Sequence, residues 1–257
     1  MVRAGALRGN QALQLKLLVE YEGTRYLGWQ LQPDGPTVQA VLEHALAVVL
    51  REPVRMRAAG RTDTGVHACG QVVAVPVTNV PADLGTCRRS LNALLPDDVA
   101  VREVTLVDDA FDPRRHARSR LYVYRLLVTR PRSAFWHRYA WHHPVALDAG
   151  AMAEAAAVLV GEHDFAAFCG ADADPVRSTV RRVLVSKLAR DDDLLVYRIE
   201  ATAFLKHMVR NVVGTLVEVG RGERAADEMA VLLAGRDRTR AGVTAPPHGL
   251  VLTAVRY

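Results

Sequence analysis

The chain has 257 residues, a formal net charge of +5 and a hydrophobic content of 50%. A chain of this length and apolar content can fill one large core or two smaller ones. No apolar run approaches the roughly 20 residues of a membrane helix, and residues 1–10 lack the apolar stretch of a secretory signal. We therefore expect a soluble, unexported protein, and the composition excludes the membrane-spanning classes.

Cysteine and arginine usage indicates the compartment and the kind of partner. Cys69, Cys87 and Cys169 are far apart and form no C-x-x-C pair, which argues against a disulfide framework and a thiolate metal site. A reducing cytoplasm is therefore the expected location. Of the 33 basic residues, 30 are arginine, and guanidinium groups both bind phosphate oxygens in pairs and stack on bases.

The first half of the chain alternates between strand and helix patterns. Residues 13–21 are rich in apolar and extended-favouring types and predict a strand. A helix follows, with Thr37 as its N-cap and an apolar stripe that starts at Val38. The remaining predicted elements of this half are a strand at 70–77, a helix at 82–95 that ends before Pro96, and a strand at 99–107.

A similar series recurs in the second half. Its predicted elements are a strand at 120–129, a helix at 148–160, strands at 180–188 and 194–201, further helices, and a final strand with the sequence LVLTAVRY. Two α+β halves with mainly antiparallel sheets follow from this order. We place an N-terminal domain at 13–112 and a C-terminal domain at 113–257, with the final strand able to pack back toward the first domain.

The clearest helical pattern runs from Phe204 to about Val219, where apolar residues repeat at helical spacing. Lys206 and Arg210 are four residues apart beside that stripe, and the small Gly214 follows one turn later. The pattern predicts a basic helix edge that can approach a ligand closely. A solvated helix face is the simpler alternative.

Residues 58–68, AAGRTDTGVHA, place several polar side chains in an apolar neighbourhood. We expect a tight loop between strands, in which Gly60 and Gly65 permit a positive φ or a close backbone approach. Arg61 and Asp63 share a face in an extended stretch, and a guanidinium beside a carboxylate favours the ionised form. Asp63 would then be a nucleophile or a base. A turn-forming role or an ordinary salt bridge is the alternative.

Metal and nucleotide sites are not predicted. Asp63 and His67 could form part of a metal site, as could His116, His137, His142 and His143, but no H-E-x-x-H or comparable ligand spacing is present. The chain also has no P-loop and no G-x-G-x-x-G motif. We therefore expect neither a metal nor a nucleotide cofactor.

A second dense segment runs from Arg114 to Arg125, RRHARSRLYVYR, and holds five arginines and two tyrosines. Arginines for phosphates and aromatic faces for bases are what single-stranded RNA recognition requires. Tyr122 and Tyr124 would lie on one face of a strand. The alternative is that this face belongs to the core and that the arginines protect an edge strand from aggregation.

Seven ordered segments together resemble the tRNA pseudouridine synthase A family, from about residue 15 onward. They are YEGTRYLGWQ (21–30), GRTDTGVHA (60–68), LNALLP (91–96), RLYVY (120–124), HDF (163–165), FLKHMVRNVVG (204–214) and AGVTAPPHGL (241–250). Seven segments in this order are far more specific than any one of them.

The resemblance implies a function and a set of site residues. The family isomerises uridine to pseudouridine in tRNA without a cofactor, near positions 38–40 of the anticodon stem-loop. Asp63 matches its catalytic aspartate, and Arg61 matches the loop partner of that residue. Tyr122 matches the tyrosine of the uracil pocket, and Arg210 the arginine that faces the carboxylate.

The resemblance also implies a fold and a partner. The family consists of two RRM-like (ferredoxin-like) halves, whose mainly antiparallel sheets join into one continuous sheet with helices packed on it and a basic cleft between the halves. It is homodimeric, and one tRNA reaches across both subunits.

Three chemical routes are open for Asp63: attack on C1′, attack on C6, or removal of a 2′ proton. Two other functions are also open. In a non-catalytic RNA-binding protein, the 58–68 loop would be structural and the arginine and tyrosine segment would bind the RNA. In a metal-dependent nuclease, Asp63 and histidines would hold the metal. Replacing Asp63 by Asn and adding a chelator distinguishes the three functions.

Overall fold

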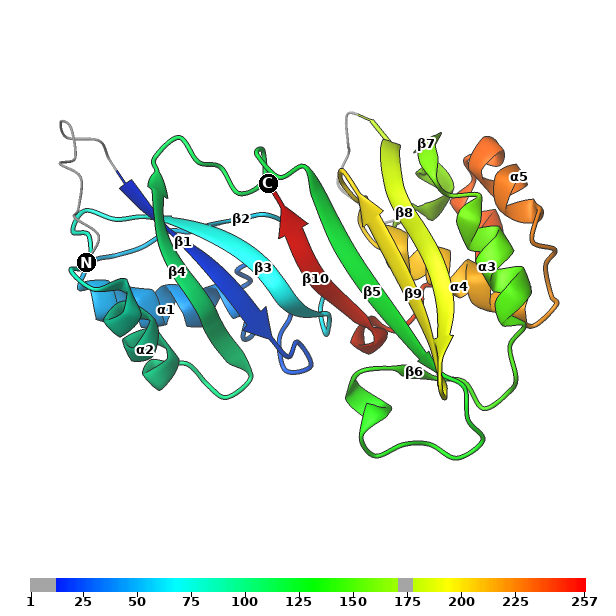
Figure 1. The fold of residues 1–257 in the computed structure, drawn as a ribbon, viewed down its shortest axis with the longest axis horizontal. Coiled ribbons are helices and arrows are strands. Elements are labelled where there is room, and N and C mark those ends of the chain that lie inside the picture. Colours follow the sequence, from blue (N-terminus) through cyan, green and yellow to red (C-terminus); the bar gives the residue numbers. More distant parts are fainter. Residues whose placement is uncertain (1–12, 171–177) are drawn as a thin grey trace, which may run out of the picture.

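The computed structural model describes residues 13–170 and 178–257, and its strands form one continuous sheet (Figure 1). Within these residues the strands are β1 (Leu13–Tyr21), β2 (Arg57–Ala58), β3 (His67–Pro76), β4 (Val99–Asp108), β5 (Ser119–Leu127), β6 (Trp141–His142), β7 (Gly161–Asp164), β8 (Val180–Asp191), β9 (Leu194–Ala201) and β10 (Leu250–Arg256). The α-helices are α1 (Val38–Leu50), α2 (Leu84–Leu94), α3 (Ala149–Ala157), α4 (Met208–Gly220) and α5 (Glu228–Gly235).

The strand order is β4-β1-β3-β10-β5-β9-β8-β7, with β2 beside β3 and β6 beside β5. The last strand, β10, joins the two parts of the sheet, because it runs parallel to β3 and antiparallel to β5. Its Val251 is in register with His67 of β3, and its Leu250 with Tyr124 of β5. The predicted α+β fold, with mainly antiparallel strands in one continuous sheet, is confirmed. The domain boundary near residue 112 stays a prediction.

The hydrophobic core lies between the sheet and the helices. Leu15 and Leu17 of β1 are fully buried at the alternating spacing of a strand, and Leu42 and Leu46 of α1 are fully buried at helical spacing. In Figure 1, α1 and α4 both pass behind the sheet. Helices and sheet therefore bury their apolar faces against each other, as the sequence patterns predict.

Capping residues determine where three helices begin. The side chains of Thr37, Asp83 and Asp148 accept hydrogen bonds from N–H groups in the first turns of α1, α2 and α3. The cap predicted at Thr37 is confirmed. The helix predicted over 82–95 starts two residues later than expected, because Asp83 is its cap.

The helix predicted from Phe204 also begins later than its apolar pattern suggests. It is α4, which starts at Met208, because His207 has a left-handed backbone with a φ of 59°. Lys206 therefore precedes the helix and does not lie one turn from Arg210 on its surface. The predicted basic helix edge is wrong.

Gly214 permits a close approach, but to the chain itself and not to a ligand. A Cβ atom at this position would lie 1.7 Å from the carbonyl oxygen of Val243. Beside it, the N–H of Gly242 donates to Thr215 Oγ1 at 2.9 Å. α4 thus packs directly against the backbone of the segment that precedes β10.

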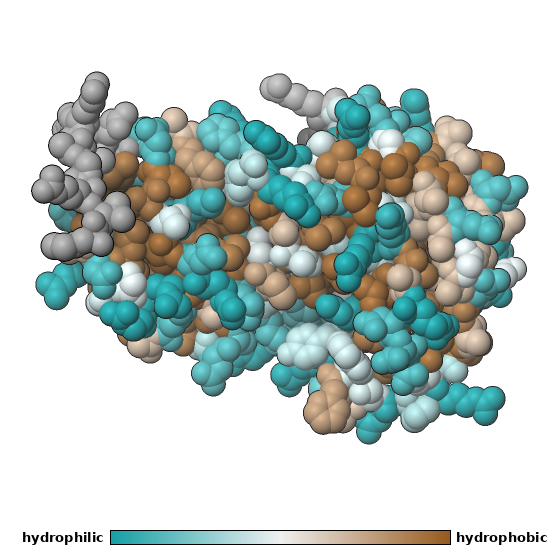
Figure 2. All heavy atoms as spheres, viewed as in Figure 1, coloured by the Kyte–Doolittle hydropathy of each residue, from teal (hydrophilic) through white to brown (hydrophobic). Residues whose placement is uncertain are grey.

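The face seen in Figure 2 carries hydrophilic and hydrophobic residues side by side. Below the sheet, the segment that leads into β6 projects from the body of the molecule (Figures 1 and 2). None of the described helices is long and apolar enough to cross a membrane.

Candidate active site

The loop that holds Asp63 joins the antiparallel strands β2 and β3, as the sequence predicts. It turns sharply, since the N–H of Val66 donates to the Asp63 carbonyl at 3.1 Å and Gly65 has a φ of 77°. The positive φ predicted at Gly65 is confirmed. At Gly60 the prediction is wrong, because φ is not positive and an added Cβ would meet no atom within 4 Å.

Residues 21–30 wrap around this loop and position it. The N–H of Trp29 donates to the Thr62 carbonyl at 3.1 Å, and the Tyr21 hydroxyl lies 2.8 Å from Thr62 Oγ1. Gly28 has a φ of 93°, and a Cβ there would lie 2.7 Å from the Thr62 carbonyl oxygen. Glycine is therefore required at position 28, next to the residue that precedes Asp63.

The Asp63 carboxylate faces two basic side chains at the start of α4. Arg210 Nη1 donates to Asp63 Oδ2 at 3.1 Å, and His207 Nε2 lies 3.6 Å from the same oxygen. The Asp63 side chain is 29% exposed and the Arg210 side chain 14%. No hydrogen bond from another described residue reaches Asp63 Oδ1. The arrangement fixes one carboxylate oxygen and leaves the other for a ligand.

Arg210 is itself held by Ala245, in the segment that leads into β10. Its Nε donates to the Ala245 carbonyl at 2.7 Å, and the N–H of Ala245 donates back to the Arg210 carbonyl at 3.1 Å. In the same segment, the Pro246 carbonyl accepts a hydrogen bond from the Tyr124 hydroxyl at 2.8 Å. The guanidinium thus has a fixed orientation toward the carboxylate, and the segment connects it to β5.

Arg61 lies apart from the carboxylate. Its side chain is exposed, and within residues 13–170 and 178–257 no hydrogen bond or ion pair joins it to Asp63. The expectation that Arg61 sits beside Asp63 is therefore not met, and Arg210 from α4 occupies that place. An exposed guanidinium on this loop is well suited to a phosphate group.

Tyr122 of β5 is buried near the carboxylate. Its ring packs edge-on against Phe204, with ring centroids 5.0 Å apart, and its residue is 9% exposed. Burial first, and then the neighbouring Tyr21 and Asp63, raise the pKa of Tyr122 well above its ordinary value of 10. The phenol is therefore neutral at physiological pH, and an uncharged aromatic ring here can pack against a base.

Two side chains of the predicted arginine and tyrosine segment are structural. Arg120 is 9% exposed and donates to the backbone carbonyls of Ala59, Arg114 and Thr202 at 2.7–2.9 Å. Tyr124 is fully buried. At these two positions RNA contact is not available, and the core alternative describes them correctly.

His67 is a structural residue at the end of the loop. It is 3% exposed, and its Nδ1 accepts a hydrogen bond from the Gly23 N–H at 2.9 Å. Nε2 therefore carries the proton and donates to the carbonyls of Arg138 at 2.8 Å and His248 at 3.1 Å. In the described part of the chain, no three His, Cys, Asp or Glu side chains form a group that could hold a metal ion.

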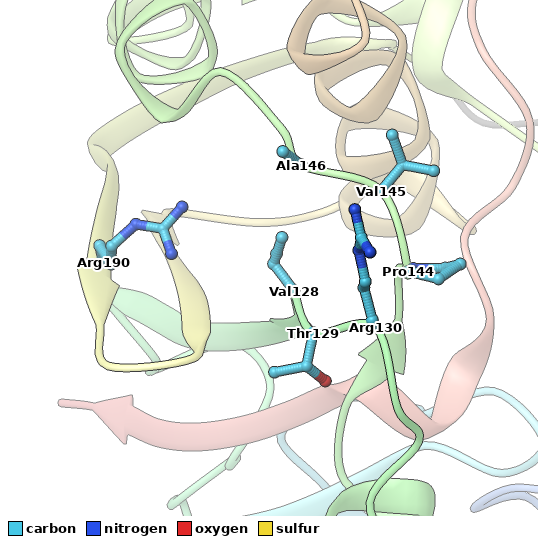
Figure 3. Close-up of a pocket in the computed structure, with 7 residues that line it drawn as sticks. All are labelled: Val128, Thr129, Arg130, Pro144, Val145, Ala146 and Arg190. Carbon is cyan, nitrogen blue, oxygen red and sulfur yellow. The ribbon is translucent and has the colours of Figure 1, made fainter.

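A depression of about 530 Å³ lies at the other end of β5, away from Asp63 (Figure 3). Its lining residues are Val128, Thr129, Arg130, Pro144, Val145, Ala146 and Arg190. Arg130 and Arg190 come from two different elements, and no acidic residue lines the space. None of the lining residues contacts Asp63, so this space is separate from the candidate active site.

Comparison with known proteins gives one consistent result. Residues 17–114 and 155–257 match the family model described as tRNA pseudouridine synthase. A tRNA pseudouridine synthase A from Myxococcus xanthus is 48% identical over 245 residues, which cover 95% of this chain and 92% of the relative. Relatives of the same name from Geotalea uraniireducens and Thermotoga petrophila are 43% and 42% identical, and the matches cover 95% and 93% of this chain and 99% and 98% of the relatives.

Four of the five residues of the candidate site lie in the matched ranges. Asp63 and Arg61 fall in the first range, and His207 and Arg210 in the second, whereas Tyr122 lies between them. The family model and the relatives agree on the class of protein, a pseudouridine synthase. The chain belongs to the tRNA pseudouridine synthase family, which confirms the resemblance carried by its seven sequence segments.

Proposed function

We propose that this protein isomerises uridine to pseudouridine in the anticodon stem-loop of tRNA, at positions 38–40, with Asp63 as the essential carboxylate. The observation that carries the proposal is the 3.1 Å pairing of Asp63 with Arg210, in a chain that belongs to this family. The reaction breaks the bond between C1′ and N1 and rejoins the uracil through C5. Atoms and redox state are conserved, so we expect no cofactor.

The neighbours of Asp63 support its role. Arg210 and His207 both contact Oδ2, which leaves Oδ1 to face the substrate. The neutral ring of Tyr122 would pack against the detached uracil and keep it near the sugar, so that the new bond forms before the base escapes. The exposed Arg61 would bind an RNA phosphate.

An anticodon loop suits this site because the target base must leave its stack before a carboxylate can reach the sugar. Unstacking costs a few kcal/mol and is easiest where the base is unpaired. Attack on C1′, attack on C6 and removal of a 2′ proton all place Asp63 Oδ1 against the extruded nucleotide. In each route the orientation imposed by Arg210 matters.

The test is the release of tritium from tRNA labelled at uracil C5, measured with a chelator present for the wild type and for Asp63→Asn. We expect release by the wild type from intact tRNA, and no turnover by Asp63→Asn, which still binds tRNA because the shape of the site is kept. Appreciable turnover by the variant would refute the role of Asp63. Tight binding without release by the wild type would favour non-catalytic RNA binding, and chelator-sensitive strand cleavage would favour a nuclease.

We also propose a homodimer in the cytoplasm. The thiols of Cys69 and Cys87 are not in disulfides, which suits a reducing compartment. The dimer rests on the family resemblance, in which one tRNA contacts both subunits. Sedimentation velocity should give a species of twice the chain mass of 28.1 kDa, and a single-chain mass at micromolar concentration would contradict it.

A further inference from the structure

The segment between β5 and β6, residues 128–140, presents aromatic and arginine side chains to solvent; we call it the aromatic–arginine loop. Phe135 is 87% exposed, Tyr139 40% and Trp136 37%. The same segment also holds three exposed arginines, which are Arg130, Arg132 and Arg138. The loop lies below the sheet and projects from the surface (Figures 1 and 2). Large aromatic side chains held in solvent are typical of an interaction surface.

The stretch of sequence that contains this loop carries charge of one sign. Residues 113–147 contain eight arginines and four histidines and no aspartate or glutamate. The depression beside the loop continues the pattern, since Arg130 and Arg190 line it without an acidic neighbour (Figure 3). The aspartates at 191–193 lie at the edge of the depression, where the Asp193 carbonyl accepts a hydrogen bond from the Val128 N–H at 2.8 Å. The loop itself presents only basic charge and therefore favours a partner that carries negative charge.

The loop is held in a defined conformation close to the loop of Asp63. His67 Nε2 donates to the Arg138 carbonyl at 2.8 Å, and the rings of His67 and Tyr139 have centroids 5.4 Å apart. Ser133 Oγ accepts hydrogen bonds from the N–H groups of Phe135 and Trp136, each at 3.2 Å. The backbone that carries the aromatic residues is therefore held in place, and His67 joins it to β3, the strand that follows Asp63.

The aromatic–arginine loop also lies outside the ranges that the family model matches. Those ranges end at residue 114 and resume at residue 155. The matched ranges hold Asp63, His207 and Arg210, whereas Tyr122 and the exposed aromatic residues both lie between them. Such a loop can select substrates without altering the chemistry of the site.

We propose that the aromatic–arginine loop is a second RNA-binding surface, on which unpaired bases of the tRNA substrate stack against Phe135 and Trp136 while Arg130 and Arg132 contact the phosphates. The proposal rests on the proposed function for the identity of the RNA. Aromatic faces interleaved with basic groups bind unpaired nucleotides in this way, since every base has a π-face and every linkage a negative charge. Contacts made here would add affinity outside the target uridine.

A second copy of this chain is the other occupant to consider, and charge argues against it. A two-fold contact places the same patch of both subunits face to face. Here it would bring the arginines of one loop against those of the other, with no carboxylate in residues 113–147 to neutralise them. Juxtaposed like charges oppose association, so an anionic partner fits better.

The test is the affinity of full-length variants for fluorescently labelled tRNA, measured directly and alongside tritium release. Phe135→Ala and Phe135→Leu should raise the Kd roughly 5- to 100-fold, the range expected for loss of one stacked base, whereas Phe135→Tyr should bind like the wild type. KM should rise with Kd. Arg132→Ala should lower the slope of log affinity against log salt by about 1. Val231→Ala, an exposed apolar position on α5, is the matched control and should change none of these values.

An unchanged Kd for Phe135→Ala would overturn the proposal. A loss of oligomeric mass in Phe135→Ala, measured without RNA by sedimentation velocity, would overturn it in favour of contact between two copies. The proposed function can fail separately. If tRNA binding depends on Phe135 but the wild-type protein releases no tritium, the RNA-binding surface is supported and the enzymatic function is refuted. Phe135 is almost fully exposed, so its replacement does not endanger the fold.

Discussion

Arg210 Nη1 lies 3.1 Å from Asp63 Oδ2, and this ion pair connects the start of α4 to the loop between β2 and β3 across 147 residues of sequence. A second hydrogen bond, from Arg210 Nε to the Ala245 carbonyl at 2.7 Å, holds the guanidinium in place independently of the carboxylate. The orientation of Asp63 therefore depends on a geometry that only a planar, multidentate cation provides.

Replacing Arg210 by lysine tests this geometry. Arg210→Lys keeps the positive charge but loses the fork that binds Ala245 and Asp63 together, so we expect the rate of tritium release to fall roughly 100-fold, the effect of a misplacement of about 1 Å. The matched control is Arg224→Lys. Arg224 forms an ion pair with Glu218, with an N–O distance of 3.0 Å, and takes no part in the candidate site. Wild-type rates for Arg210→Lys in single-turnover experiments would contradict the role of orientation.

His207 offers a way to remove a site side chain without disturbing the backbone. Its left-handed φ of 59° is a conformation that glycine adopts readily, so His207→Gly should leave the start of α4 intact. We expect the single-turnover rate to fall by at most about fivefold, because a partly exposed side-chain contact of this kind contributes no more than about 1 kcal/mol. Arg51→Gly is the control, with the same backbone geometry (φ 56°) at the end of α1. Equal rates for His207→Gly and Arg51→Gly would show that the imidazole has no part in positioning Asp63.

Patterns of neighbouring residues predict those elements that depend on interactions between residues close in sequence. The alternation of β1 and the cap at Thr37 both appear in the structure as predicted. The start of α4 does not, because the apolar spacing continues through Leu205 while the backbone of His207 turns left-handed. The residue at which a helix begins depends on tertiary contacts, and the spacing of apolar residues does not reveal those contacts.

The candidate site shows the same division. The resemblance, rather than any spacing, indicated that Arg210 faces Asp63, since no local rule relates residues so far apart. Arg61 was expected beside Asp63 on the assumption of an extended backbone, whereas the loop turns between Asp63 and Val66. A helical interpretation of FLKHMVRNVVG gives His207 no particular role, so the pattern does not single it out. Its position three residues before Arg210 was the available signal.

Gly28 is a position where a single added methyl group should damage the site. Gly28→Ala places a Cβ 2.7 Å from the Thr62 carbonyl oxygen at a φ of 93°. We expect a loss of about 1–3 kcal/mol in the free energy of unfolding, together with reduced turnover, because Thr62 precedes Asp63. Gly222→Ala is the control: its φ of 72° is also positive, but no atom lies within 4 Å of the added Cβ. Urea unfolding should show a larger loss for Gly28→Ala, and similar losses in both variants would mean that the contact with Thr62 is unimportant.

Four buried tyrosines predict how the protein responds to alkaline pH. Burial is the main cause that raises the pKa of Tyr21, Tyr122, Tyr124 and Tyr197 above the ordinary value of 10. Above pH 10 the unfolded chain loses protons that the folded chain retains, so the free energy of unfolding falls as pH rises, whereas below pH 10 these groups have no effect. Each such tyrosine contributes about 0.7 kcal/mol per pH unit to the slope at pH 10 and about 1.4 kcal/mol per pH unit well above it, where the unfolded-state phenol is fully ionised.

The slope can be assigned to individual tyrosines by calorimetry or urea unfolding between pH 9 and 11. Tyr197→Phe removes one buried phenol, so the stability lost between pH 9 and pH 11 should be smaller by about 1.4 kcal/mol in total, because the unfolded-state phenol ionises across this range. Ser186→Ala is the matched control, because it removes the 2.8 Å hydrogen bond between Ser186 and Tyr197 but keeps the phenol. The control should therefore be less stable at every pH and retain the wild-type slope. If both variants show the wild-type slope, the alkaline response does not come from Tyr197, and its phenol must ionise in the folded protein as readily as in the unfolded chain.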